Sequence, residues 1–324
     1  MGGMILLLIS LVSWLALAGP AAAEWRSETV AAPGPVTSIE VRGTDTHIAI
    51  GPNWYRMAPA TGALIPAQAP GFPAVPPGGL SDGRVASSDG AIARAWLAHP
   101  TDRYRHGVLG DAIEAGSVVV ERNDGRIATV ASGSNAVFED LLPRIAALDG
   151  VDRIVVVKSY LHRGSALAII NAESMKVMAE TPPIGHANAW LNPAGIADFD
   201  GNGTTDIAVV RQPHVVGLLQ LWSWQDQQLK KVAEVPDVSN HFIGSKALGM
   251  NWTADFDADG HSDLAVPSLD RRSLRLIAFV PRVRDIARIA LPARVATNIG
   301  PISIGGRPGL VAGLEDGRLV VIRE

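Results

Sequence analysis

Two stretches in the second half of the chain carry the fold prediction. Residues 195–210 read GIADFDGNGTTDIAVV, and residues 252–267 read WTADFDADGHSDLAVP. The two stretches align without a gap, and in each an acidic, glycine-containing loop leads into an apolar run. A unit that recurs within one chain is typical of repeat architectures, in which each copy is one supersecondary element that packs against the next.

The rest of the chain after residue 24 consists of short β-prone runs, such as residues 117–120, 153–157 and 318–322, and no stretch has a convincing amphipathic helical pattern. Asp-Gly and Asn-Gly pairs, the strongest short hairpin signals, separate many of these runs. Such a pattern predicts a sandwich, a barrel or a propeller, and the repeat favours the propeller. Seven candidate copies of one strand begin near His47, Arg84, Asp111, Arg153, Asp206, Asp263 and Gly309. We therefore expect an all-β propeller with seven blades, or six if one copy is false, each of about four antiparallel strands.

The two ends of the chain are expected to meet. The last predicted blade has only three strand-like runs, so a strand near residues 25–30 is predicted to pair with residues 318–323 and supply the fourth strand. Closing the ring in this way removes an open sheet edge, which would otherwise favour aggregation.

The first 23 residues are typical of an export signal. An apolar run over residues 4–18 is followed by Gly19 and Pro20 and then by three alanines, which fit a small-residue cleavage site. The run is too short to cross a bilayer as a helix. We predict a signal peptide over residues 1–23, a repeat domain over residues 24–324, a periplasmic or secreted location, and no membrane span after cleavage.

Composition excludes several classes of function. The 324 residues include no Cys, which excludes disulfides, cysteine-ligated metal sites and a thiol nucleophile. A net charge of -4 argues against a nucleic-acid partner. Motifs of serine hydrolases, zinc proteases and phosphate-binding loops are missing as well. The sequence therefore assigns no catalytic and no cofactor-binding residue, and we expect a protein that is not an enzyme.

The stretches ADFDGNGTTDIAVV and ADFDADGHSDLAVP resemble the FG-GAP/VCBS repeats that build the β-propellers of integrin α-chains and of many exported bacterial proteins. The resemblance implies that each acidic loop is a calcium loop between two strands of a blade. The Phe-Gly and Gly-Ala-Pro corners of the family pattern are absent, and the five other candidate repeats lack the acidic loop.

By this resemblance the two loops supply the ligands of two structural calcium ions. In the first loop the ligand positions fall on Asp198, Asp200, Asn202, Thr204 and Asp206, and in the second they fall on Asp255, Asp257, Asp259, His261 and Asp263. Calcium takes six to eight oxygen ligands, and the residue at the fourth of these positions would contribute its backbone carbonyl. The second loop has four carboxylates, so we expect it to gain more from binding a cation.

A ligand face is predicted from residues that precede the two loops. Rings with amide and imidazole neighbours suit a sugar or a peptide. The candidates are Arg105, His106, His186, Asn188, Trp190, His241, Asn251 and Trp252. The predicted function is an exported, calcium-stabilised binding or scaffold module for a protein or glycan partner. The alternatives are a propeller-fold hydrolase or lyase with its site at the channel mouth, and a subunit of an envelope assembly.

Overall fold

A computed structural model describes residues 24–324, and the predicted signal peptide lies outside these residues. The described part of the chain is all-β and contains no helix, and therefore none that is long and apolar enough to cross a membrane. The strands form four four-stranded antiparallel sheets and one nine-stranded sheet. The all-β prediction is confirmed.

Three of the four-stranded sheets are simple meanders in which chain order equals spatial order. The first contains β2 (Val36–Arg42), β3 (Asp45–Ile50), β4 (Asn53–Met57) and β5 (Leu64–Ala67). The second contains β15 (Leu191–Ala197), β16 (Asp206–Arg211), β17 (Leu218–Gln225) and β18 (Gln228–Val235). The third contains β19 (Trp252–Ala254), β20 (Asp263–Pro267), β21 (Ser273–Ala278) and β22 (Arg284–Ala290).

The fourth four-stranded sheet joins the two ends of the described chain. It consists of β23 (Val295–Ile304), β24 (Arg307–Leu314), β25 (Leu319–Arg323) and the N-terminal strand β1 (Arg26–Val30). β1 pairs antiparallel with β25, in a register that places Arg26 opposite Arg323 and Val30 opposite Leu319. The predicted pairing of the two ends is confirmed.

The nine-stranded sheet contains two four-stranded meanders. The first consists of β6 (Ala86–Ser87), β7 (Ile92–Thr101), β8 (Glu114–Arg122) and β9 (Ile127–Ala131), and the second of β11 (Arg144–Leu148), β12 (Val151–Tyr160), β13 (Gly164–Asn171) and β14 (Lys176–Glu180). The short strand β10 (Ala136–Phe138) pairs with both β8 and β12 and so merges the two meanders.

The count of seven strand copies is not confirmed. The sequence suggested two copies of the repeated strand, one near Arg84 and one near Asp111. The structure has one such strand in this region, β7, and it lies between these two positions. Arg84 lies in the segment before β6, and Asp111 lies in the loop between β7 and β8. Spacing in the sequence alone did not distinguish these two loop segments from strands, because short loop segments rich in Gly and Ala resemble short strands. Residues 24–324 thus contain six four-stranded groups, two of them merged.

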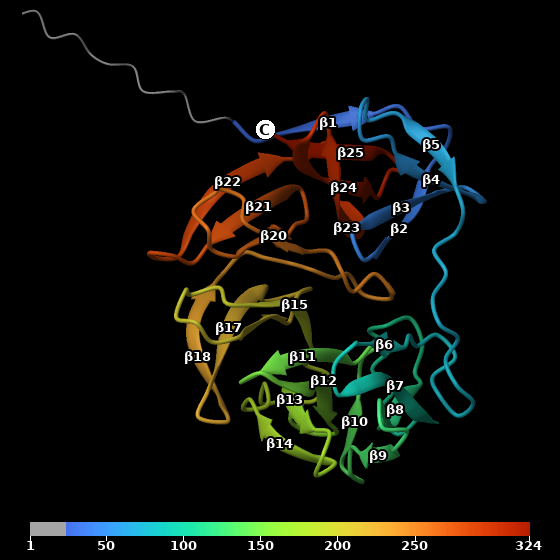
Figure 1. The fold of residues 1–324 in the computed structure, drawn as a ribbon, viewed down its shortest axis with the longest axis vertical. Coiled ribbons are helices and arrows are strands. Elements are labelled where there is room, and N and C mark those ends of the chain that lie inside the picture. Colours follow the sequence, from blue (N-terminus) through green and yellow to red (C-terminus); the bar gives the residue numbers. More distant parts are fainter. Residues whose placement is uncertain (1–23) are drawn as a thin grey trace, which may run out of the picture.

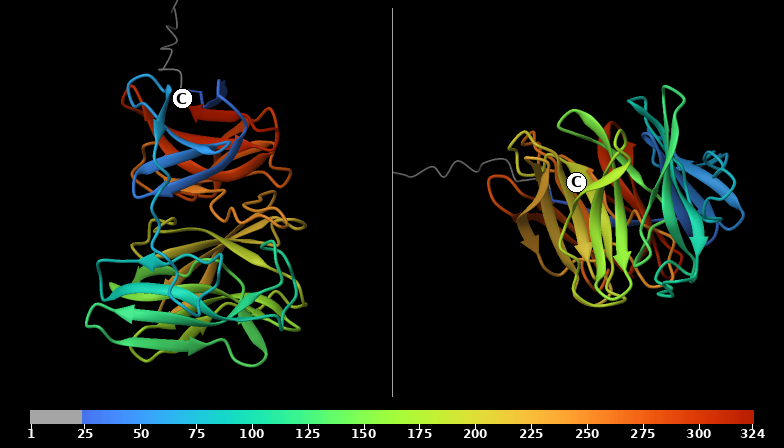
Figure 2. Two further views of the ribbon diagram at one scale, coloured as in Figure 1. Left: turned by 90° about the vertical axis from the view of Figure 1, so that its right-hand side faces the viewer. Right: turned by 90° about the horizontal axis from the view of Figure 1, so that it is seen from below.

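Figure 1 and the two views of Figure 2 show how the six groups are arranged. One central cavity lies between them, lined by residues from several groups and from the segments that connect them. Its wall includes residues of β2, β11, β15, β19 and β23, each of which is an end strand of its group, and these are five of the six groups. Strands in the middle of each group are apolar on both faces because neighbouring groups cover them, and β13 is buried almost throughout. Outer strands are more exposed instead, as β18 is with its two adjacent exposed lysines.

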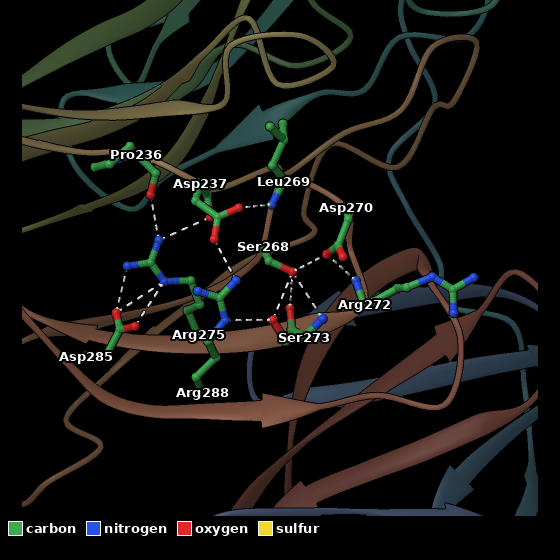
Figure 3. A network of polar contacts seen from close by, with 10 residues as sticks. All are labelled: Pro236, Asp237, Ser268, Leu269, Asp270, Arg272, Ser273, Arg275, Asp285 and Arg288. Carbon is green, nitrogen blue, oxygen red and sulfur yellow. Dashed lines mark hydrogen bonds and ion pairs between the residues drawn. The ribbon is translucent and has the colours of Figure 1, made fainter.

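Polar contacts also join neighbouring groups. On β21, Arg275 is 8% exposed, pairs with Asp285 at 2.8 Å and donates to the carbonyl oxygen of Pro236 at 2.6 Å. Figure 3 shows how this guanidinium ties the segment after β18 to the sheet β19–β22. At the junction between the β2–β5 and β6–β9 groups, Arg84 binds both carboxylate oxygens of Glu40, at 2.6 and 2.7 Å.

Candidate functional site

The two acidic loops connect the first two strands of neighbouring sheets, β15 to β16 and β19 to β20. Each loop turns at a glycine in the left-handed region, Gly203 with φ of 82° and Gly260 with φ of 87°. A side chain is strained at such a φ, so glycine suits both positions. The predicted sharp turns are therefore present in both loops.

Each loop gathers three carboxylates around one point. In the first loop these belong to Asp198, Asp200 and Asp206, and in the second to Asp255, Asp257 and Asp263. One oxygen from each member of a triad lies within 4.8 Å of the others. Three of the five predicted ligand positions in each loop thus converge, and each triad can hold a metal ion.

The remaining side chains of the predicted ligand sets stabilise the turns. The Asn202 side-chain oxygen accepts hydrogen bonds from the backbone N–H of Thr204 at 2.7 Å and from its hydroxyl at 2.5 Å. Asp259 accepts one from the backbone N–H of His261 at 2.9 Å. These contacts hold the side chains in local turns, as is usual for Asn and Asp.

Backbone N–H groups orient the last carboxylate of each triad. Phe199 donates its N–H to one oxygen of Asp206 at 2.9 Å, and Phe256 donates to Asp263 at 2.7 Å. Within residues 24–324, the second oxygen of Asp206 and one oxygen of Asp257 are buried and have no hydrogen-bond partner. Buried oxygens of this kind are costly unless they are paired, and a cation would pair them.

The last carboxylate of each triad has a raised pKa. Burial raises the pKa of Asp206, and it raises the pKa of Asp263 to about 6, with further increases from the charges of Asp257, Asp259 and Asp255. A raised pKa means that the ionised carboxylate is disfavoured where it lies. A bound divalent cation would reverse that preference, so the arrangement suits a hard cation with oxygen ligands.

One difference between the loops was not visible in the sequence. Arg284, at the start of β22, donates to Asp257 at 2.6 Å, and its guanidinium lies 4.0 Å from Asp259. This positive charge already offsets part of the repulsion in the second loop. The expectation that the second loop gains more from a cation omitted this partner, which lies on a different strand.

The two loops lie against each other. A side chain added at Gly201 in the first loop would place its Cβ 3.0 Å from Nδ1 of His261 in the second. His261 was expected to contribute only its backbone, and its ring packs on the neighbouring loop. The two acidic triads therefore occupy adjacent positions at the junction of two sheets.

Comparison with protein-family models gives no match for this chain. Comparison with curated proteins also gives none. The likeness to FG-GAP/VCBS repeats therefore rests on residues 195–210 and 252–267.

The predicted ligand-face residues are distributed over different environments. Arg105, His186 and Asn188 are exposed and His106 is partly buried, whereas Trp190 and His241 are 2% and 1% exposed. Asn251 and Trp252 line the central cavity. The aromatic ring of Trp190 packs on His241, with 4.8 Å between ring centroids. Trp190 is therefore part of the packed interior.

One of these candidates, His106, forms a carboxylate–histidine pair. Nδ1 of His106 lies 2.6 Å from the carboxylate of Glu139, which is fully buried and also accepts a hydrogen bond from Ser159. Burial raises the pKa of Glu139, and the contact with His106 opposes that shift. Sequence reasoning missed Glu139 because a Glu-Asp pair between two apolar segments matches no motif.

A second pair consists of two histidines. Nε2 of His241 donates to the carbonyl oxygen of Ser245 at 2.8 Å, so its Nδ1 accepts a hydrogen bond from His214, also at 2.8 Å. Desolvation lowers the pKa of His214 to about 4 and of His241 to about 3, so both are neutral at pH 7. No hydrogen bond within residues 24–324 joins this pair to His106, and the two pairs remain separate.

Proposed function

We propose that the chain is a six-bladed β-propeller whose two acidic loops each bind a calcium ion. It acts outside the cytoplasm as a binding or scaffold module for a protein or glycan partner. The observation that carries the calcium proposal is the convergence of three carboxylates in each loop, with a buried oxygen of Asp206 and of Asp257 left without a partner. Such oxygens need a positive partner, and oxygen-only ligand sets suit calcium.

The way the strands are grouped supports six blades. Each of the six groups has four antiparallel strands, and in five of them an end strand lines the cavity. Pairing of β1 with β25 protects an edge of the last group, as ring closure does in propellers. The merged nine-stranded sheet would be two blades linked by β10.

A structural role for calcium follows from the position of the loops. Each loop joins the first and second strand of a group, and all three carboxylates come from one nine-residue segment. An ion held there would fix a tight turn and stabilise the junction of two blades. Carboxylates occupied in this way make poor general acids, which supports a binding module over an enzyme.

Thermal unfolding with and without calcium tests this proposal. Saturating calcium should raise the melting temperature relative to chelator, because ligand at about 100 times its Kd adds roughly 2.7 kcal/mol per site. Asp200→Asn and Asp257→Asn should each remove part of this gain. Asp226→Asn is the matched control, since Asp226 is an exposed partner of Lys230 and belongs to neither triad.

The calcium proposal fails if the melting temperature is the same in calcium and in chelator. It also fails if Asp226→Asn reduces the calcium response as much as Asp200→Asn does. An equal response to magnesium would contradict the ion assignment, because magnesium requires a stricter octahedral geometry.

The His106–Glu139 pair favours one second candidate, a propeller hydrolase or lyase. A buried carboxylate that orients an imidazole is the arrangement of a general base, and the His106 side chain is still 17% exposed. Turnover of an ester or glycan panel that His106→Ala abolishes without unfolding the protein would favour this candidate. Absence of turnover by the native protein across the panel would count against it.

A further inference from the structure

The central cavity has a volume of about 430 Å³, within the usual size range of small-molecule sites. Strands and linkers from all around the ring line it, including Val41 of β2, Ile196 of β15, Trp252 of β19 and Ile299 of β23. It is separate from the acidic loops, whose carboxylates are not among its lining residues.

Three positive side chains reach this cavity from three separate segments. They are Arg84, Arg144 and Lys246, and Glu40 is the only acidic side chain that residues 24–324 contribute to the lining. Backbone contacts bring the three segments together, since the N–H of Arg84 donates to the carbonyl oxygen of Leu141 at 2.8 Å. Lys246 pairs with Asp82, two residues before Arg84, at 3.0 Å. The positive groups therefore gather on one side of the cavity.

Two of these groups have donors to spare. Both terminal nitrogens of Arg84 donate hydrogen bonds to Glu40. In Arg144 only Nη1 donates, to Asp140 and to the carbonyl oxygen of Leu142. Lys246 has one carboxylate partner for its three N–H groups, and its side chain is 54% exposed. Among the described residues, Arg144 and Lys246 thus offer unused donors at the cavity.

The amide groups in the wall are already used. Asn298 accepts from the N–H of Gly249 at 2.8 Å and donates to the carbonyl oxygen of Ile39 at 2.9 Å. Asn251 donates to the carbonyl oxygen of Ala194 at 2.5 Å, and its oxygen faces the amide of Asn240 at 3.4 Å. Few neutral polar groups are left for the hydroxyls of a sugar.

Apolar side chains form much of the remaining wall. Leu142, Leu248 and the ring of Trp252 are only partly buried and line the cavity. A flat apolar group can pack on the Trp252 ring while an anionic group reaches the positive side.

From these observations we propose that the central cavity is a binding site for a small organic anion that has an apolar body, such as an aromatic carboxylate. Arg144 and Lys246 bind the anionic group, and Trp252 with the neighbouring leucines contacts the body. This site shares only Asn251 and Trp252 with the predicted ligand face, and it does not depend on the acidic loops.

Isothermal titration calorimetry with matched probes tests the site. Naphthylacetate should bind to the full-length chain, and its neutral analogue naphthylacetamide should bind at least about tenfold more weakly, because charge-assisted hydrogen bonds are lost. Methyl glucoside should give no measurable heat. Calcium-saturated protein is used throughout, so that failure of this site and failure of the calcium proposal appear in different measurements.

Two variants locate the binding. Lys246→Gln should weaken naphthylacetate by about tenfold, whereas Lys230→Gln, an exposed lysine on β18, should leave it unchanged. Leu142→Glu places a carboxylate in the cavity wall and should abolish binding. Melting curves in calcium verify that each variant is folded.

Four outcomes overturn this proposal. They are no binding of naphthylacetate, equal binding of the amide, tighter binding of the glucoside, and unchanged affinity in both Lys246→Gln and Leu142→Glu.

Discussion

At Glu114 the chain buries a carboxyl group without a partner. The residue is 1% exposed, and within residues 24–324 neither of its carboxyl oxygens makes a hydrogen bond. Desolvation raises its pKa to about 10, and the nearby charges of Glu139 and Asp111 add to that shift. The folded state therefore keeps Glu114 protonated at neutral pH, whereas the unfolded chain ionises it near pH 4.5.

This difference in pKa predicts a pH-dependent cost. Because the folded pKa is raised, the contribution of Glu114 to stability is fully present below about pH 4.5 and is lost progressively up to about pH 10. Glu114→Gln removes this dependence and should stabilise the protein at pH 8 but much less at pH 4. The slope of unfolding free energy against pH should change by up to about 1.4 kcal/mol per pH unit.

Urea unfolding between pH 4 and pH 9 measures this effect. Glu173→Gln, an exposed glutamate beyond β13, is the control and should follow the native pH profile. A parallel profile for Glu114→Gln and the native protein would show that Glu114 is ionised in the folded state.

At the scale of elements, the two acidic loops are near copies with different surroundings. Both use the last carboxylate to accept a backbone N–H, and both contain one buried oxygen that has no partner among the described residues. Within residues 24–324, only the second loop has a positive partner, since Arg284 of β22 reaches Asp257. The two loops thus differ in charge in two ways: Asp259 stands where the first loop has Asn202, and another strand contributes Arg284 to the second loop.

Arg284→Gln is predicted to change the second loop in two opposite ways. Without calcium, loss of the positive charge leaves the carboxylates less compensated and should cost up to about 1 kcal/mol, since this pair is partly exposed. With calcium, the ion no longer competes with a guanidinium, so the calcium-induced rise in melting temperature should become larger than in the native protein.

Melting curves at matched calcium concentrations measure both effects. Arg318→Gln removes an exposed arginine paired with Asp316, far from the loops, and should leave the calcium increment unchanged. An increment that shrinks in Arg284→Gln would mean that the arginine supports the loop geometry rather than competing with the ion.

At the scale of the whole molecule, the pairing of β1 with β25 holds the two ends together. Five residue pairs join the strands, and Trp25 just before β1 packs edge-on against Phe256 of the second acidic loop, at 5.6 Å between ring centroids. Without β1, the strand β25 would present unpaired backbone groups at a sheet edge. The N-terminal strand thus completes the last sheet and also contacts a loop of the preceding one.

A chain that starts at Pro33, without β1, is predicted to be less stable than one that starts at Glu24. Loss of the ladder and of the Trp25 contact should cost about 3–5 kcal/mol, and the exposed edge should promote self-association. Urea unfolding and light scattering measure these changes. Equal stability and a monomeric state for both chains would mean that β1 is dispensable.

The sequence by itself determined the strands, the turns and the contents of each acidic loop. Alternation of apolar runs with Asp-Gly turns is a local signal, so strands such as β12, β16 and β25 and the glycine turns at Gly203 and Gly260 were predictable. Pairing of the ends also followed from local counting, because a three-stranded last group needs a fourth strand.

Only the tertiary structure decided which distant side chains meet. Arg284 reaches the second loop, Glu139 reaches His106, and Arg84, Arg144 and Lys246 share one cavity. The number of copies of the repeated strand also differs from the prediction, because β7 stands where the sequence suggested two copies. These outcomes depend on how the sheets pack around the centre. Packing brings together residues that are far apart in the chain, and no periodic pattern in the sequence indicates which of them will meet. Hairpins form from neighbouring residues, whereas a site between sheets exists only once the sheets have packed.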